Sequence, residues 1–291
     1  MLVANSPSLL SQKSKPAEMQ PCELVRAAVA NELAAGNNTA IKFMFRSRRQ
    51  IPEGVQNKVY VEGNEALATM TVSGEGLGLT PKVEHTEKEH IEEFLNDPAK
   101  LHKEHERERQ EVENTLRIVK ALPDAFFYKY DGEVAGREGL GKPGDRLVRL
   151  KFTPNPSYSP PSRVEQVLQG MDGNLLIDAT ATRLAQIDGT LFREVTFGWG
   201  IFGHLDKGGH FLVRQGEAAD GYWAITEMNL HITGKILLVK NLSLISDEVF
   251  TDFHRLPDDL PYAKAVELLQ NEQAKLAQSR GIQAVENTAT R

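Results

Sequence analysis

The chain has 291 residues, of which 40% are hydrophobic and 25% charged, and its formal net charge is −6. This length suits one large domain or two ordinary ones, and the apolar fraction is enough to bury a core. No stretch approaches the ~18 consecutive apolar residues of a spanning helix. An acidic balance without a basic cluster argues against nucleic acid as a partner. We therefore expect a globular chain that is not transmembrane and binds no nucleic acid.

The N-terminal segment, residues 1–20, is rich in Ser, Pro and Lys, and we expect it to be disordered. It lacks the charged start and the longer apolar run of a secretory signal. Cys22 is the single cysteine, so no intrachain disulfide can form. Its polar neighbours indicate an ordinary residue at a helix start.

The first predicted helix runs from Pro21 to Gly36, because Val25, Val29 and Leu33 recur at helical spacing. Alternating apolar residues then predict strands at 39–49, 57–62 and 66–73.

A charged arm interrupts the strands at 81–121. Residues 82–120 contain 11 acidic and 8 basic side chains, and the middle of the segment has no apolar side. A helix that is polar all round is solvated or bound to a partner. We therefore predict an inserted helical arm, anchored by small apolar groups at both ends.

Strands resume at 125–131 and 145–152, and prolines end the second one. Ser162 and Glu165 form a capping box that predicts a short amphipathic helix over 162–171. Further strands are expected at 174–178, 182–193, 195–202, 209–217, 222–232, 235–246 and 249–255. A C-terminal helix is expected within 258–280, followed by a disordered tail at 281–291.

The stretch FGWGI at 197–201 alternates bulky apolar residues with glycines. The odd positions from Ala185 to Ile201 form an almost continuous apolar face, and the even positions are mostly polar or bare. Period-two alternation predicts one buried and one wet face, and the glycines permit a sharp bend or close packing. We expect the following side chains to line an apolar ligand cavity: Leu191, Phe197, Trp199, Ile201, Met228, Leu230 and Leu238. Trp223 is expected to point to the opposite face.

A run of strands joined by tight turns cannot form a parallel sheet, since parallel pairing needs long crossovers. We therefore predict an α+β fold, a strongly curved, half-open antiparallel β-barrel of about ten strands. Amphipathic helices lie against its concave face, within a single domain over 21–257. Two interpretations remain for this face, a filled core or a partly open cavity.

Metal-binding patterns are weak in this sequence. His204, Asp206 and His210 surround a glycine turn, but no Cys or Glu in the pattern completes a set of ligands. His102 and His105 lie three apart in the charged arm, without an HExxH sequence. We expect structural or solvated roles for these side chains, and no metal.

Catalytic patterns are weaker still. The glycine-rich segment at 74–78 lacks the GK[ST] ending of a phosphate loop, and no GxSxG elbow occurs. We expect neither an enzyme nor a cofactor, and we assign no catalytic residue.

Several motifs carry a resemblance to known proteins. They are FTPNPSYSPPSR at 152–163, VLQGM at 167–171, ID at 177–178, FGWGI at 197–201 and KGG at 207–209. They resemble a group of uncharacterised bacterial proteins that are similar to the LolA/LolB-like outer-membrane lipoprotein-sorting superfamily. The likeness covers roughly residues 125–257. It implies a half-open barrel closed by helices, an apolar cavity for acyl chains, no cofactor, and a place in the periplasm or cell envelope.

The leading functional hypothesis is therefore a non-enzymatic carrier or binding protein for a lipid or lipoprotein acyl chain. The alternative is an envelope scaffold whose sheet is fully packed and whose charged arm at 82–120 docks a protein partner. An enzyme ranks third.

Overall fold

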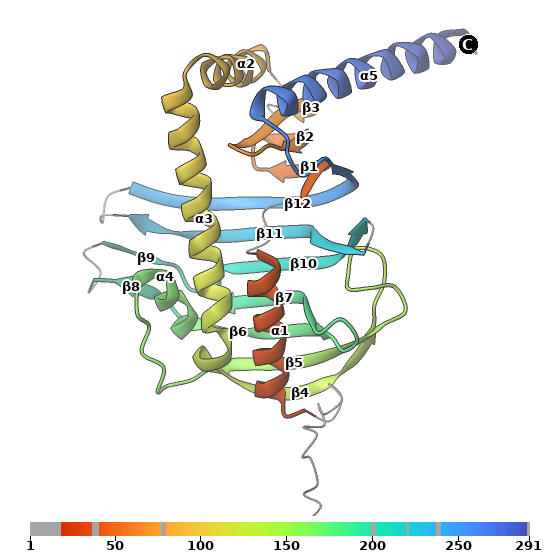
Figure 1. Cartoon of the computed structure of the whole chain (residues 1–291). Helices are drawn as coiled ribbons and strands as arrows, with labels where there is room; N and C mark the ends of the chain where they lie inside the picture. Colours follow the sequence, from red (N-terminus) through yellow and green to blue (C-terminus); the bar gives the residue numbers. More distant parts are fainter. Residues whose placement is uncertain are drawn as a thin grey trace, which may run out of the picture.

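The computed structural model describes residues 19–36, 41–76, 80–198, 202–219, 221–236 and 240–289. Within them the chain forms one antiparallel sheet of 12 strands and five α-helices, so the predicted α+β class is confirmed (Figure 1). The sheet is not closed, since β3 and β4 lie at its two ends. It has more strands than the ten or so expected from the sequence.

The helices are α1 (Pro21–Gly36), α2 (Pro81–Asn96), α3 (Pro98–Ala125), α4 (Arg163–Gln166) and α5 (Tyr262–Ala289), with a 3-10 turn η2 (Val167–Gly170). The strands are β1 (Lys42–Ile51), β2 (Gly54–Glu62), β3 (Leu67–Gly76), β4 (Phe126–Ala135), β5 (Arg146–Pro154), β6 (Met171–Asp178), β7 (Arg183–Leu191), β8 (Val195–Phe197), β9 (Gly203–Leu205), β10 (His210–Ala219), β11 (Tyr222–Ile236) and β12 (Lys240–Leu256).

The strand order is β3-β2-β1-β12-β11-β10-β7-β6-β5-β4. The short strands β8 and β9 lie in the segment between β7 and β10 and pair with each other. β9 also pairs with the end of β11. The strand pair most distant in sequence is β1 and β12. Their pairing brings an N-terminal strand and the last strand of the chain together inside the sheet.

Helices α1 and α3 lie across one face of the sheet, which we call the front face (Figure 1). The apolar stripe of α1, including Val25 and Val29, packs with the end of α3 against β5, β6 and β7. Leu150 and Ile177 are fully buried in this front core. The predicted amphipathic helix at 21–36 therefore covers the β4–β7 part of the front face.

The opposite face, the back face, carries a second core at the far end of the sheet. Helix α5 packs on β2 and β3 there, with Val266 and Leu269 against Val59 and Val61. The two helix layers thus lie on opposite faces and at opposite ends of one sheet.

A third, smaller core covers the back of β5 and β6. Leu147 and Leu176 alternate with front-core neighbours and pack with Leu140 from the β4–β5 loop. Gly141 has a positive φ of 66°, and a Cβ there would lie 2.6 Å from the Leu147 side chain. Only a glycine fits this close approach of loop to strand.

The predicted arm at 81–121 folds as α2 and most of α3. Thr80 caps α2, Asp97 caps α3, and a proline opens each helix, as expected for helix N-termini. Ile91 and Phe94 anchor α2 in the α5 core. Helix α3 then runs from this core to the front core at α1 (Figure 1).

Several predicted boundaries were wrong. The expected break at Thr233–Gly234 does not exist, because β11 continues to Ile236 and Gly234 lies against the His204 carbonyl of β9. β12 is likewise continuous from Lys240 to Leu256, through the predicted gap after residue 246. Gly234 therefore marks close packing against β9 and not a turn.

The helical predictions also need correction. The expected helix at 162–171 is a single α-turn, α4, followed by η2, after which Met171 starts β6. Ser162 does cap it by accepting from the Val164 amide at 3.1 Å. At the other end of the chain, α5 extends to Ala289, past residue 280 where the sequence led us to end it.

Candidate functional site

The front surface of the central strands is the apolar region of the sheet that helices leave least covered. Among the described residues, no helix packs broadly against β10, β11 or β12, whereas α1 packs on β7 and α5 on β2 and β3. Val213, Met228 and Leu230 lie on this surface, each of them half-buried. Their position follows from register, because Met228 is opposite Val213 on β10 and Leu230 is opposite Phe211, a front-core neighbour.

A buried polar group continues the same cross-strand row. Glu248 on β12 is opposite Met228 and also opposite Arg49 on β1. Its carboxylate is only 5% exposed and accepts hydrogen bonds from the Ser47 hydroxyl at 2.6 Å and the Tyr60 hydroxyl at 3.0 Å. Arg49 Nε lies 3.9 Å from the other carboxylate oxygen. Burial, followed by the charge of Glu248, raises the pKa of Tyr60, so this hydroxyl stays a donor at neutral pH.

Aromatic rings extend the front surface toward β1 and β2. Phe45 stacks on Tyr60 with ring centroids 4.9 Å apart, and on Phe253 at 5.3 Å. Phe250 meets both Phe45 and Tyr60 at an angle. The front of the central strands therefore combines an apolar half, an aromatic half and one hydrogen-bonded carboxylate between them.

A pocket of about 240 Å³ opens at the edge of the front core. It lies between the start of α1 and strands β4 and β5, with Leu24, Val148 and Leu150 among its walls and Tyr130 and Glu133 also lining it. Met19, Gln20 and Pro21 complete its wall, so it lies where the N-terminal segment meets the edge of the front core. At roughly 30 Å³ per methylene-sized or water-sized group, this volume corresponds to about eight such groups.

The predicted cavity residues fall into three groups. Met228 and Leu230 lie on the half-covered front surface, and Phe197 packs against the front core. Leu191 is 1% exposed within that core and lies away from the half-covered surface. Trp199, Ile201 and Leu238 lie outside the described residues.

The apolar face predicted on the odd positions breaks at one residue. Ala185 is an extra residue between the β6–β7 pairs Leu176–Gln186 and Ile177–Leu184. This bulge turns Ala185 to the third, smaller core on the back face, while Leu184 joins the front core. Trp223, in contrast, lies against the third core on the back face, as predicted.

The glycines of the 195–203 run have two physical roles. Gly198 has a positive φ of 55°, and the Phe202 ring lies where a Cβ would be. Gly203 has a φ of 122° and lies against the Lys235 carbonyl of β11. The Arg163 guanidinium covers Phe202, 3.8 Å from the ring centroid. The described ends of the run therefore pair as β8 and β9, and they pack onto β11 and α4.

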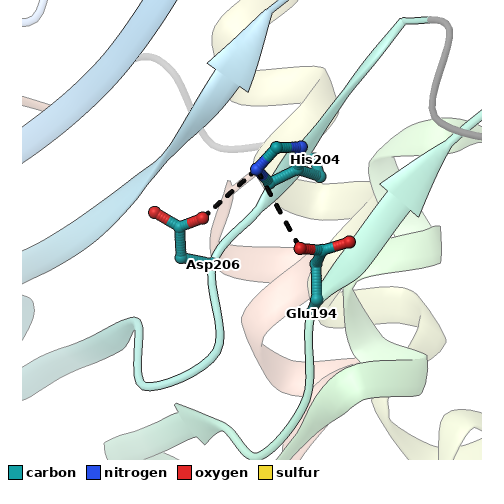
Figure 2. Close-up of side chains that lie close together, drawn as sticks. All are labelled: Glu194, His204 and Asp206. Carbon is teal, nitrogen blue, oxygen red and sulfur yellow. Dashed lines mark ion pairs between the residues drawn. The ribbon is translucent and has the colours of Figure 1, made fainter. Parts of the chain in front are cut away.

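The histidines of this region do not share one site. His210 on β10 pairs with Asp188 across to β7 at 2.9 Å, and it is not grouped with Asp206. His204 on β9 lies instead between Asp206 and Glu194. Figure 2 shows the two carboxylates facing the same edge of the imidazole ring.

Glu194 is the member that the sequence analysis missed. It lies ten positions before His204, and only the folding of β8 against β9 brings the two together. A usable signal exists in the alternation, since Glu194 and Thr196 share a face and Thr196 is directly opposite His204. In the arm, His105 hydrogen-bonds the Glu65 carbonyl at 2.9 Å, which gives that residue a structural role.

Comparisons with protein-family models, with curated proteins and with solved structures find no match to this chain. In the parts of the chain that the structure describes, no helix has the length and apolarity needed to cross a membrane.

Proposed function

We propose that this protein is a non-enzymatic binding or carrier protein for a lipid or lipoprotein acyl chain. The observation that carries the proposal is the half-buried apolar surface of Val213, Met228 and Leu230, on strands against which no described helix packs broadly. In this proposal the sheet works as a half-barrel, and the acyl chain lies along its front between the strands and α3.

The energetics favour such a ligand. Burial of an acyl chain gains ~0.8 kcal/mol per CH₂, so a single chain of ordinary length suffices without specific polar contacts. By its resemblance to lipoprotein-sorting proteins, we further propose that the chain works in the periplasm or cell envelope.

The alternative, docking of a protein partner through the charged arm, has weaker support. Arg107 of α3 pairs with Glu104 and Glu111, and Arg109 pairs in the same way with Glu106 and Glu113. Charges that are already paired along a helix offer less to a partner. We therefore place the apolar ligand first.

The test replaces neighbouring residues that point to opposite faces of one strand. Leu230→Lys puts a charge into the front surface, whereas His231→Lys changes the back face, where His231 pairs with Asp247. Delipidated protein is titrated with a fluorescent fatty acid. We expect binding by the wild type and by His231→Lys, and at least tenfold weaker binding by Leu230→Lys.

Melting temperatures of both variants serve as the folding control. Wild-type protein that takes up no probe, or Leu230→Lys protein that is folded and binds as well as wild type, would reject the proposal. Native mass spectrometry of protein purified from its own host should also show a bound lipid.

A further inference from the structure

The structure assigns a divalent transition-metal site, of the zinc type, to Glu194, His204 and Asp206 at the base of the β8–β9 hairpin. This site goes beyond the proposed lipid function and does not depend on it. The three residues each offer one donor atom, and these atoms lie within 4.8 Å of one another.

The geometry is that of a shared cation. His204 Nε2 lies 3.3 Å from Asp206 Oδ1 and 4.0 Å from Glu194 Oε2 (Figure 2). Zinc bonds of 2.0–2.2 Å to nitrogen and oxygen place neighbouring donors roughly 3.3–3.5 Å apart in a tetrahedron. A protonated imidazole would donate its single Nε2–H to one acceptor, and 4.0 Å is beyond a hydrogen bond. The 3.3 Å separation matches the donor spacing around zinc, and the 4.0 Å separation is roughly 0.5 Å longer, so a bound ion would draw the Glu194 carboxylate inward.

The ligands are held by the hairpin and by a neighbouring strand. Thr233 on β11 donates its hydroxyl to the second oxygen of Asp206 at 2.6 Å, and its carbonyl accepts from the Asp206 amide. Hydrogen bonds of this kind fix the orientation of carboxylates that ligate metals. His204 is held by the β9 ladder, opposite Lys235. Glu194 lies just before β8, and its side chain is half-exposed.

The donor set decides the class of metal. One imidazole and two carboxylates, without a thiolate, suit Zn²⁺, and the same site would bind Mn²⁺ or Co²⁺ more weakly. Calcium needs six to eight oxygen donors and is disfavoured by the imidazole. Three protein ligands leave a fourth position for water, so the site resembles exchangeable sites more than closed structural ones.

A bound ion would cross-link the two strands, β8 and β9, of the segment that connects β7 to β10. Glu194 precedes β8, whereas His204 and Asp206 lie on or just after β9. The two ends of this segment meet where the Leu191 amide donates a hydrogen bond to the Gly209 carbonyl. Binding to the folded state alone would raise the melting temperature with metal concentration.

The experiment titrates the chelator-treated full chain with ZnCl₂ by calorimetry and with CoCl₂ by visible absorption. We expect one Zn²⁺ per chain, a rise in melting temperature, and a Co²⁺ spectrum that is displaced by Zn²⁺. His204→Gln should abolish all three signals. Thr233→Val, which leaves the ligands but removes the support of Asp206, should weaken binding roughly 10- to 100-fold.

The matched control is His210→Gln, which removes a histidine that pairs with Asp188 on the neighbouring strands. It should bind Zn²⁺ as the wild type does. The inference is overturned if the wild type binds no Zn²⁺ in the micromolar range. It is equally overturned if His204→Gln keeps the site, or if His210→Gln loses it to the same extent.

Discussion

The carboxylate of Glu32 fastens α1 to the sheet. It is 8% exposed and accepts from Arg183 Nε at 2.7 Å, from the second guanidinium nitrogen at 2.9 Å and from the Leu184 amide at 2.9 Å. The Arg183 guanidinium also lies 5.3 Å from the Trp223 ring centroid. A bidentate pair of this kind supplies geometric specificity as well as energy.

We predict that Glu32→Ala lowers the free energy of unfolding by about 3–5 kcal/mol, because it leaves a largely buried guanidinium and a buried amide without their acceptor. Urea unfolding measures the loss. Glu23→Ala, at an exposed position of the same helix, should cost less than about 1 kcal/mol. A loss below that value for Glu32→Ala would show that α1 is held by its apolar stripe alone.

A second carboxylate makes stability depend on pH. The hydrogen bond from Arg46 on β1 lowers the pKa of Glu272 on α5. A carboxyl with a lowered folded-state pKa contributes stability above its unfolded pKa, about 4.3, and loses it as the pH falls through the folded value.

We therefore expect Glu272→Gln to destabilise the protein by about 1 kcal/mol at pH 7, and to cost progressively less below pH 4. Denaturant midpoints of the variant and the wild type across pH 3–7 test this expectation. Parallel pH curves for the two proteins would contradict it.

At the scale of elements, the charged arm protects an exposed strand edge. β3 ends the sheet, and its outward amides need acceptors. Glu87 of α2 accepts from the Thr71 amide at 2.8 Å, and Glu108 of α3 accepts from the Leu67 amide at 3.1 Å. Burial raises the pKa of Glu108, which reports how closely α3 lies on this edge. The arm that looks unattached in sequence is thus partly a cap for the sheet.

Loss of this cap should promote edge-to-edge association. We predict that the double variant Glu87→Ala, Glu108→Ala forms dimers or larger species at concentrations where the wild type does not. Light scattering after size-exclusion chromatography measures this. The control is Glu106→Ala, Glu113→Ala, on the exposed side of α3, which should keep the wild-type mass. Equal association by both pairs would place the effect in net charge and not in the edge.

Sequence periodicity was sufficient for most elements and failed where strands bulge. The α1 stripe, the arm and the antiparallel sequence of strands follow from spacing and turn residues. Alternation cannot locate Ala185, because a bulge shifts a strand by one residue without changing its composition. Gly234 was misread for a related reason, since a glycine in close packing and a glycine in a turn look alike in sequence.

For the whole molecule, the order of strands and the faces taken by helices could not be read from the chain. The β1–β12 pairing and the position of α5 on the back depend on contacts distant in sequence. The residues of the candidate sites likewise differ in whether the sequence could predict them. Met228 and Leu230 follow from local alternation, whereas the buried Glu248 group and the Glu194–His204 approach depend on which strands meet.

The separation of the cores has a consequence for dynamics. The front core at β4–β7 and the back core at β2–β3 lie at opposite ends, and the strands between them carry exposed apolar residues such as Leu244 and Val249. Local stability follows local apolar burial, so opening should be easiest in the middle of the sheet.

Hydrogen exchange followed by mass spectrometry tests this order. Amides of 147–152 should exchange slowest, and those of 241–250 on β12 should exchange faster, although both strands lie between two neighbours. Addition of a saturated fatty acid should then slow exchange at 211–215 and 226–232, where the front surface lies, and leave 147–152 unchanged. Uniform slowing along the whole sheet would point to general stabilisation, and no slowing at all would count against a ligand on the central strands.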